Sequence, residues 1–386
     1  MLWPRRFHGS SNILVLLLAV GTGLSADKRP SPVDSVFTPL IDAKSPGAAV
    51  MLRKNGHTVF MRGYGVTDLQ TFHAIDAHTN FRLASFTKQF TAMAIMLLVH
   101  DGKLRYDRNL AEIFPGFPEY GRAITVRHLL THTSGLADYE TLMDQKEKAG
   151  GPTWSAGRQI HDEEVFALLA EQTQGVFAPG TSWAYSNSGY VVLGLIVAKV
   201  SGMPYPEFLR RRIFVPLKMS HTVAYVDGQN VVPHRAFGYS KKEGRFEETD
   251  QSSTSATLGD SGIYSDLLDL AHWDDALTRG KLLPKSEMAP ALEPVRLNDG
   301  SQTYWPSNGD GDNLASGKPV SFGFGWFLSP IDGYPCMWHT GSTSGFRTII
   351  ERFPERKLTI VILSNRTDLN TVELAQRVLS SDNETK

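Results

Sequence analysis

The sequence predicts an α/β fold in which both ends of the chain supply strands to one antiparallel sheet flanked by helices. Two β-rich runs, residues 47–55 and 57–64, meet at Asn55-Gly56, a dipeptide that strongly favours a hairpin. Further β patterns lie near the C-terminus, and the segment between them is typical of short helices. Strands at both ends of a helical middle indicate one sheet with a mostly helical inserted region.

The chain divides into a leader, residues 1–26, and one domain, residues 27–386. The leader has two arginines, an apolar run at 13–20 and then small residues, an order typical of a secretory signal peptide. The run is much shorter than the roughly 20 residues that span a bilayer. We expect cleavage after Ser25 or Ala26 and a periplasmic or secreted protein. The alternative is a protein tethered to the membrane by an uncleaved signal.

Composition limits the classes of partner. Of 386 residues, 41% are hydrophobic and 20% are charged, which suits one large domain or two smaller ones. The 39 basic and 40 acidic residues nearly cancel, so no charge excess favours nucleic acid or an anionic membrane surface. We expect a small-molecule or peptidyl substrate. The single cysteine, Cys336, excludes an intramolecular disulfide, and the sequence leaves the oligomeric state open.

A helix that begins at Ser85 is expected to lie at the centre of the fold. From Phe86 to Val99 its apolar residues fall on every side of a helical projection, which is typical of a buried helix. A shorter helical pattern over residues 31–43 precedes the sheet. The sheet part would comprise residues of about 27–100 and 256–386, and the helical part residues of about 101–255.

Four further helices are predicted in the middle of the chain. The first covers residues 126–131 and is capped by Thr125. The others cover residues 160–174, 188–200 and 206–214. The helix over 160–174 is amphipathic, with acidic residues in its first turn, where the helix dipole favours them.

The last part of the chain returns to β patterns after an irregular stretch. Residues 231–256 are polar, with short strands expected around 236–239. Ser265 is expected to cap a helix that ends at Leu277, and residues 297–318 form a long polar loop. Four β patterns and a final helix follow, at residues 322–328, 335–339, 347–353, 358–363 and 371–379.

Three short motifs carry groups that can do chemistry together. Ser85 and Lys88 are one helical turn apart, which places an amine beside a hydroxyl, a nucleophile beside its activator. The alternative for Ser85 is a helix N-cap. Tyr185-Ser186-Asn187 precedes a helix, and His339-Thr340-Gly341 ends a strand.

Tyr185 and Asn187 have separate uses in such a site. The Tyr185 phenol can act as a general base only if cations lower its pKa from about 10, and Lys88 and His339 are the natural cations. Asn187 offers both a donor and an acceptor, which suits a substrate amide.

These motifs resemble those of the serine β-lactamase and penicillin-binding protein superfamily. The Tyr-x-Asn form is similar to that of the branch containing class C β-lactamases, D,D-peptidases and related esterases. The resemblance runs from about Gly47 to Asn365. Supporting stretches lie at residues 129–136, 185–194, 214–219 and 264–273.

The resemblance implies a β-lactamase/transpeptidase-like fold and a role for each motif. Ser85 would be the nucleophile that forms an acyl-enzyme, with Lys88 and Tyr185 sharing proton transfer, and which of the two is the base stays open. The backbone amides of Ser85 and Ser342 would form the oxyanion hole. Residues in contact with substrate would be Asn187, His339, Thr340 and Gly341.

The third motif departs from the β-lactamases of this branch, which usually have lysine where His339 stands. With an unperturbed pKa near 6.5, this imidazole would be about a quarter protonated at pH 7, so turnover should depend on pH near neutrality. The resemblance therefore favours a D,D-peptidase, D-amino-acid peptidase or esterase. The alternatives are a class C-type β-lactamase and a penicillin-binding sensor domain that does not turn over.

We expect neither a cofactor nor a metal. His128 and His132 are four residues apart, as zinc ligands on helices often are, but no third ligand accompanies them. The acyl-enzyme chemistry implied by the resemblance uses only the protein's own side chains.

Overall fold

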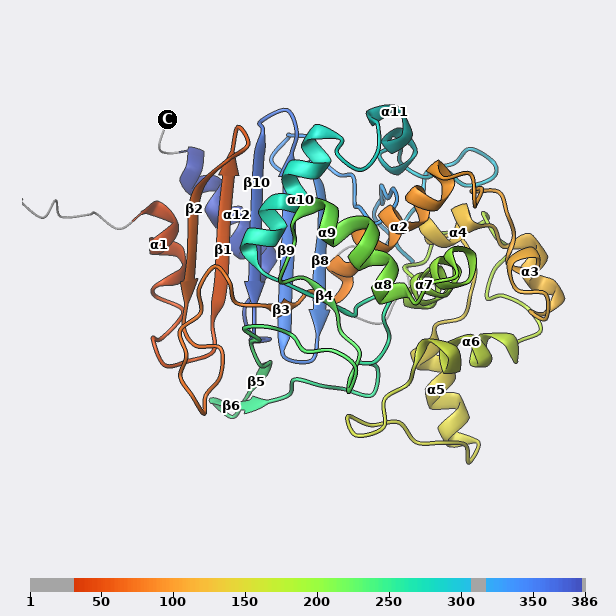
Figure 1. Ribbon diagram of the computed structural model, residues 1–386, viewed down its shortest axis with the longest axis horizontal. Helices are drawn as coiled ribbons and strands as arrows, with labels where there is room; N and C mark the ends of the chain where they lie inside the picture. The colour runs from red at the N-terminus through yellow and green to blue at the C-terminus, as the bar shows by residue number, and fades with distance from the viewer. Residues whose placement is uncertain (1–30, 307–316, 384–386) are drawn as a thin grey trace, which may run out of the picture.

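Five antiparallel strands form the central sheet of the computed structural model, which describes residues 31–306 and 317–383 (Figure 1). Their order is β2-β1-β10-β9-β8, so the two N-terminal strands lie together and join the three C-terminal strands through the pairing of β1 with β10. The predicted sheet built from both ends is confirmed. The strands are β1 (Ala48–Lys54), β2 (His57–Tyr64), β8 (Met337–Thr343), β9 (Phe346–Phe353) and β10 (Leu358–Ser364).

The predicted hairpin between β1 and β2 is confirmed by its turn. Asn55 and Gly56 have φ angles of 52° and 77°, the left-handed values that a two-residue hairpin turn requires. The register between the two strands shifts at Leu52 and Arg53. A bulge of this kind strengthens the twist of the sheet edge.

Both faces of the sheet are covered by helices. Alternate residues of β1 point to opposite faces, so Val50 and Met51 belong to different hydrophobic clusters. The cluster around Val50 includes side chains of α1 (Pro32–Phe37) and α12 (Thr371–Asn383). The cluster around Met51 includes side chains of α10 (Leu267–Arg279), which crosses in front of the sheet in Figure 1.

One carboxylate is buried in this sheet without a partner. Glu351 on β9 is 0% exposed, and neither carboxylate oxygen has a hydrogen-bond partner within the described part of the chain. Burial and the charge of Asp332 raise the pKa of Glu351 to about 7. The folded state therefore binds this proton more tightly than the unfolded state, and the associated stability is lost as the pH rises through about 7.

Replacing Glu351 with glutamine is expected to flatten this pH dependence. In the wild-type protein the group should lower the free energy of unfolding by about 2 kcal/mol between pH 5 and pH 8. Urea titrations at both pH values measure the difference. Glu373→Gln, at an exposed position on α12, is the matched control and should keep the wild-type slope. An unchanged slope in Glu351→Gln would contradict the assignment.

The inserted region between the strands of the two chain ends is mostly helical, as predicted. Its longest helices, α2 (Lys88–His100) and α7 (Asn187–Ser201), pack side by side in the main hydrophobic core. α2 is buried on nearly all sides, as its apolar pattern predicts. The others are η1 (Ala84–Thr87), α3 (Leu110–Ile113), η2 (Glu119–Ala123), α4 (Val126–Leu130), α5 (Tyr139–Lys148), α6 (Asp162–Ala170), α8 (Tyr205–Leu209), η3 (Arg210–Phe214), α9 (Val215–Leu217), α11 (Lys285–Met288) and η4 (Ala289–Ala291).

Several predicted boundaries are wrong. The cap of α10 is Asp266, whose Oδ1 accepts from the Asp269 amide at 2.8 Å, whereas Ser265 ends a strand and shares its hydroxyl with Thr222. The helix predicted over 160–174 is only α6, because the chain leaves the helical conformation after Glu171.

The strand predicted over 322–328 is absent. Phe322 and Phe327 form only an isolated bridge, because the chain turns at Gly325, where φ is 74°. Of the long loop predicted over 297–318, residues 307–316 lie outside the described residues, as does the predicted signal peptide.

A second, three-stranded sheet was not predicted. Its strands are β3 (Phe81–Arg82), β7 (Ile263–Ser265) and β4 (Val223–Ala224), in the order β3-β7-β4. Such short pairings join segments too far apart in sequence to leave a periodic signal. A hairpin of β5 (Tyr239–Lys242) and β6 (Arg245–Glu248) replaces the strands expected around 236–239.

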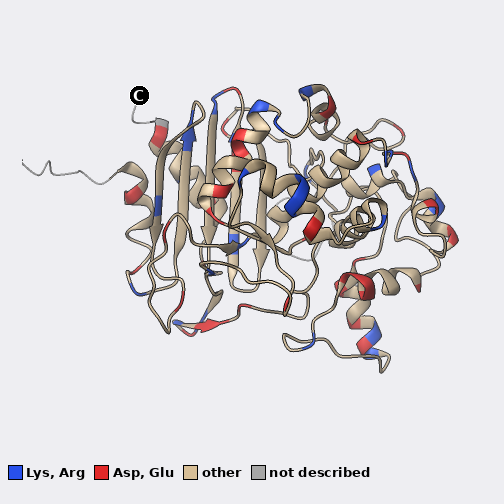
Figure 2. Ribbon diagram, in the orientation of Figure 1, with Lys and Arg blue, Asp and Glu red and all other residues tan. Residues whose placement is uncertain are grey.

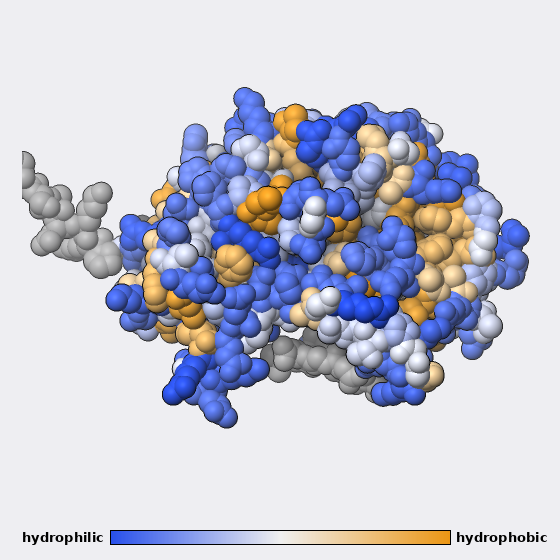
Figure 3. Space-filling model, turned by 60° about the horizontal axis from the view of Figure 1, so that its bottom comes forward, coloured by the Kyte–Doolittle hydropathy of each residue, from blue (hydrophilic) through white to orange (hydrophobic). Residues whose placement is uncertain are grey.

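The surface agrees with a nearly neutral chain. Acidic and basic residues are interspersed on the face seen in Figure 2, and hydrophilic side chains cover most of the face in Figure 3, with apolar patches between them. In the described ranges no single helix has the length and hydrophobicity to cross a membrane. α7 together with Tyr205–Leu217 meets these limits only as a pair bent by 75°.

Candidate active site

Ser85 lies on a tight turn between β3 and α2. The turn is held by β7, because the Leu83 amide donates to the Ile263 carbonyl at 2.8 Å and the Ile263 amide donates to the Thr87 hydroxyl at 3.2 Å. Ala84 has a φ of 50°, which is rare for a residue with a side chain. The Ser85 hydroxyl caps no helix: the N-cap residue of η1 is Leu83 and that of α2 is Thr87, and neither helix has a side-chain cap. The N-cap alternative is therefore wrong.

Lys88 is fully buried beside Ser85. Its Nζ donates to Ser85 Oγ at 2.9 Å, to Asn187 Oδ1 at 2.8 Å and to the Asp260 carbonyl at 3.1 Å. Burial lowers the pKa of Lys88 to about 8, although the charges of Asp260 and Glu140 oppose the shift. A useful fraction of this amine is therefore neutral near neutral pH, and it lies within reach of the Ser85 proton.

Tyr185 lies on the other side of the amine. Lys88 Nζ is 4.9 Å from the centre of its ring, and the phenol oxygen is buried beside Ser85 without a well-formed hydrogen bond. Burial raises the pKa of Tyr185 well above its usual value, the charge of Asp260 adds to this, and the Ser85 hydroxyl opposes it. The condition under which Tyr185 could act as a base, a pKa lowered by Lys88 and His339, is therefore not met.

His339 is a neutral imidazole in this site. It is 1% exposed on β8, and its Nδ1 donates to the Thr340 carbonyl at 2.6 Å, which leaves a lone pair on Nε2. Burial and the charge of Lys88 lower the pKa of His339 to about 3. The expected titration of this side chain near neutrality is therefore wrong. The cause is burial next to a cation, which no spacing in the sequence reveals.

Gly341 allows the third motif to touch the Ser85 turn. A Cβ on residue 341 would lie 2.0 Å from the Leu83 carbonyl oxygen, so only glycine permits this contact. The same carbonyl accepts from the Thr348 hydroxyl at 2.9 Å, which ties β9 to the turn. Ser342 follows on β8, and its exposed position lies next to the contact between β8 and η1.

His132 is a residue of the site that the sequence analysis weighed as a metal ligand and placed in the supporting stretch 129–136, without a role in the site. It is fully buried, its ring centre lies 4.4 Å from that of Tyr185, and its Nδ1 accepts from the Ser186 amide at 3.1 Å. It therefore positions the second motif. His128 instead accepts from the Thr125 amide at 3.2 Å and helps to cap α4. The contacts of His132 come from residues about fifty positions away, so no local pattern indicated them.

Aromatic side chains line the side of the site next to Tyr185 and His339. The Phe327 ring is stacked at 6.4 Å from Tyr185 and lies 5.2 Å from His339. The remaining members of this aromatic cluster are Trp183, Trp305, Phe322 and Trp338. They provide an apolar wall beside the reactive groups.

One cavity lies next to the second motif, and a larger one lies apart from all three motifs. A cavity of about 580 Å³ is lined by Tyr185 and Ser186 and extends to Leu136 and Leu142. A larger cavity of about 970 Å³ lies between α7, α8 and β4, and no residue of the three motifs lines it. The smaller cavity therefore touches the second motif, whereas Ser85, Lys88 and His339 line neither cavity.

Comparisons with known proteins agree with this arrangement. The family model described as Beta-lactamase matches residues 33–381. A penicillin-binding protein of Bacillus subtilis is 30% identical over 357 residues, which cover 89% of this chain and 73% of the relative. The octameric penicillin-binding protein homologue from Pyrococcus abyssi has a TM-score of 0.71 at 27% identity, with 88% of this chain and 73% of that chain covered.

A second solved structure has a similar fold at lower identity. D-amino acid amidase from Ochrobactrum anthropi SV3, in complex with D-phenylalanine, has a TM-score of 0.74 at 24% identity. The match covers 92% of this chain and 99% of the amidase. At this identity the likeness concerns the fold.

Proposed function

This chain belongs to the Beta-lactamase family, and from that premise we propose that it is a serine hydrolase in which Ser85 forms an acyl-enzyme. The observation that carries the proposal is the buried Lys88 amine, 2.9 Å from Ser85 Oγ, with its pKa lowered to about 8. A buried amine of this kind activates a hydroxyl without a cofactor.

Lys88 is the base of the proposed acylation step. Its neutral form accepts the Ser85 proton while Oγ attacks the substrate carbonyl, and the resulting ammonium is held by Asn187 and the Asp260 carbonyl. The developing oxyanion would be stabilised by the amides of Ser85 and Ser342. Each such donor contributes roughly 3 to 4 kcal/mol.

Tyr185 is better suited to give a proton than to take one. Its raised pKa keeps the phenol protonated, and the residue lies beside Ser85 with its ring stacked on Phe327 of the aromatic cluster. In the proposed mechanism it donates a proton to the leaving group and recovers one from the Lys88 ammonium. Asn187 and His339 remain available to contact the acyl part of the substrate.

The neutral His339 favours a particular class of substrate. A lysine at this position would offer a permanent cation to a substrate carboxylate, whereas this imidazole offers only a lone pair at Nε2. We therefore propose that the protein hydrolyses amides or esters that carry no carboxylate near the scissile bond.

A panel of acyl donors tests the proposal. We expect kcat/KM for a D-amino acid amide or a short-chain nitrophenyl ester to exceed that for a D-alanyl-D-alanine peptide or benzylpenicillin by at least about tenfold, the value of one lost charge-assisted contact. In His339→Lys the ratio should move toward the substrates that carry a carboxylate. Preferential turnover of penicillin would identify a β-lactamase, and a stable penicilloyl adduct without turnover a sensor; either result would contradict the proposal.

A further inference from the structure

Three segments bring side chains that can bind a metal ion to one end of the three-stranded sheet. β3 and β4 both run antiparallel to β7, so the residues that precede them lie beside the residue that follows β7. His78 precedes β3, His221 precedes β4 and Asp266 follows β7. A fourth segment adds His234, because Arg235 bridges Asn80 beside β3.

Three of the four side chains lie within reach of one ion, and the His234 ring lies beside them. Potential ligand atoms of His78, His221 and Asp266 all lie within 4.8 Å of one another. The three imidazole rings form a triangle, with centres 5.4 Å apart for His78 and His221, 5.7 Å for His221 and His234, and 6.3 Å for His78 and His234. His78 and His234 are exposed, so their rings can rotate to close the remaining distance to a metal.

His221 and Asp266 are already held in place. Asp266 Oδ2 accepts from His221 Nδ1 at 2.7 Å, while Asp266 Oδ1 is engaged by the first turn of α10. Asp269 Oδ2 accepts from the amides of His221 and Thr222 at 2.8 Å each. Because these two side chains are already ordered, metal binding would cost less side-chain conformational entropy.

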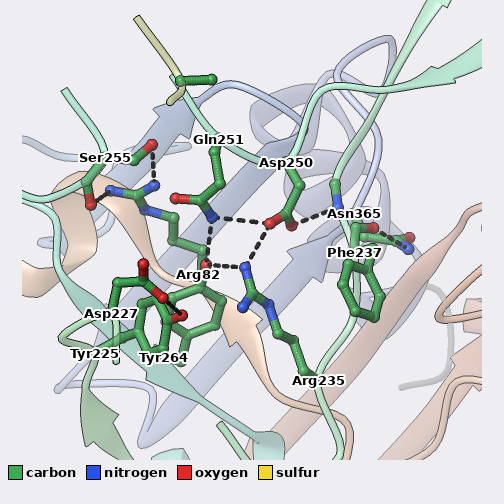
Figure 4. Close-up of polar contacts among 12 residues, drawn as sticks. Arg82, Tyr225, Asp227, Arg235, Phe237, Asp250, Gln251, Ser255, Tyr264 and Asn365 are labelled. Carbon is green, nitrogen blue, oxygen red and sulfur yellow. Dashed lines mark hydrogen bonds and ion pairs between the residues drawn. The ribbon is translucent and has the colours of Figure 1, made fainter. Parts of the chain in front are cut away.

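The segment that carries His234 is fixed on both sides. The Asn80 amide donates to the His234 carbonyl at 2.9 Å, and Asn80 Nδ2 donates to the Pro233 carbonyl at 2.7 Å. Figure 4 shows the next residue, Arg235, pointing toward Asp250 and Tyr264, with which it forms an ion pair and a hydrogen bond. The backbone of His234 is thus held against Asn80, two residues after His78.

The local charge favours a cation. Asp266 and Asp269 are both buried at the start of α10, and in the part of the chain that the structure describes neither forms an ion pair with a lysine or an arginine. A metal ion would neutralise this pair of carboxylates.

We propose that His78, His221, His234 and Asp266 bind one divalent transition-metal ion, with Zn²⁺ as the ion that this set suits best. Imidazole nitrogens and one carboxylate in fourfold coordination are the ligands that Zn²⁺ commonly takes. Four protein ligands leave no open position, so the ion has a structural role. It ties together the segments that lead into β3 and the Ser85 turn.

Metal binding to the full chain tests the proposal. After treatment with a chelator, titration with ZnCl₂ in a calorimeter should show one tight site per chain. At about 100 times the dissociation constant, Zn²⁺ should raise Tm by about 3 to 4 °C, and a chelator should reverse the change. Absence of saturable binding to protein that retains esterase activity would overturn the proposal.

Matched variants identify the ligands. His78→Ala and His234→Ala change exposed side chains and should each weaken Zn²⁺ binding at least tenfold, with no change in Tm in the presence of chelator. His73→Ala removes another exposed histidine of the same segment, outside the cluster, and should bind Zn²⁺ as the wild type does. Equal affinity in His78→Ala and His73→Ala would show surface binding only and would overturn the assignment.

Discussion

Replacing Ser85 with alanine is expected to abolish turnover of every amide and ester substrate, with a fall in kcat of roughly 10⁴-fold or more. The variant keeps the buried Lys88 and Tyr185 but has no oxygen to form the acyl bond, so neither group has a proton to move. The wild-type protein, mixed with a slow acyl donor, should gain the mass of one acyl group. Intact-protein mass spectrometry over time measures this adduct, and Ser85→Ala should show none.

A control variant shows whether the effect is specific to Ser85 or follows from removing any serine hydroxyl. Ser240→Ala removes a half-buried serine on β5 whose hydroxyl pairs with Thr249, away from the three motifs. It should be acylated and should turn over as the wild type does. An adduct that persists in Ser85→Ala would show that another residue is the nucleophile.

Removing the amine of Lys88 is expected to slow acylation by about 10² to 10⁴-fold, the usual contribution of a general base. The wild-type rate should also follow the protonation of this amine. Below its pKa of about 8 the amine is charged and cannot accept a proton, so the rate should rise with pH and level off above that value. Pre-steady-state acylation rates of Lys88→Met, measured from pH 6 to pH 10, should be low and should lack this rise.

Two further variants distinguish a base from a fixed charge. Lys88→Arg keeps a cation that cannot lose its proton, so it should be as slow as Lys88→Met. His339→Gln should retain the rise near pH 8, because its imidazole is already neutral throughout this range. Recovery of activity in Lys88→Arg would show that the charge, and not proton transfer, is what the site needs. Loss of the rise in His339→Gln would assign it to the imidazole.

The main features of the fold could be predicted because they depend on local patterns. The hairpin turn requires left-handed backbone conformations that only a few residue types adopt easily. Asn55 and Gly56 are two of these types, and both have such conformations in the structure. The continuous apolar sequence of α2 has no polar face to leave in water, so burial on all sides follows directly. The prediction of a strand over 322–328 was wrong. An apolar aromatic run also suits a turn around Gly325 that packs its side chains inward.

The sequence predicted which residues form the site but not which of them are charged. The three motifs identified Ser85, Lys88, Tyr185 and His339, and the structure brings all four together. Their protonation states depend on burial and on the neighbouring charges, which are properties of the folded environment. Reference pKa values therefore assigned a partly charged His339, which was wrong, and could not show that burial raises the pKa of Tyr185.

The sequence by itself determined which groups could react, where the first hairpin and the buried helix α2 lie, and that the two chain ends share a sheet. Only the tertiary structure decided which groups are charged, that His132 supports Tyr185, and that His78, His221, His234 and Asp266 meet. The physical reason is the range of the interactions. Hairpin turns and helical periodicity act between near neighbours in the chain, whereas desolvation and side-chain clusters depend on residues that only folding brings into contact.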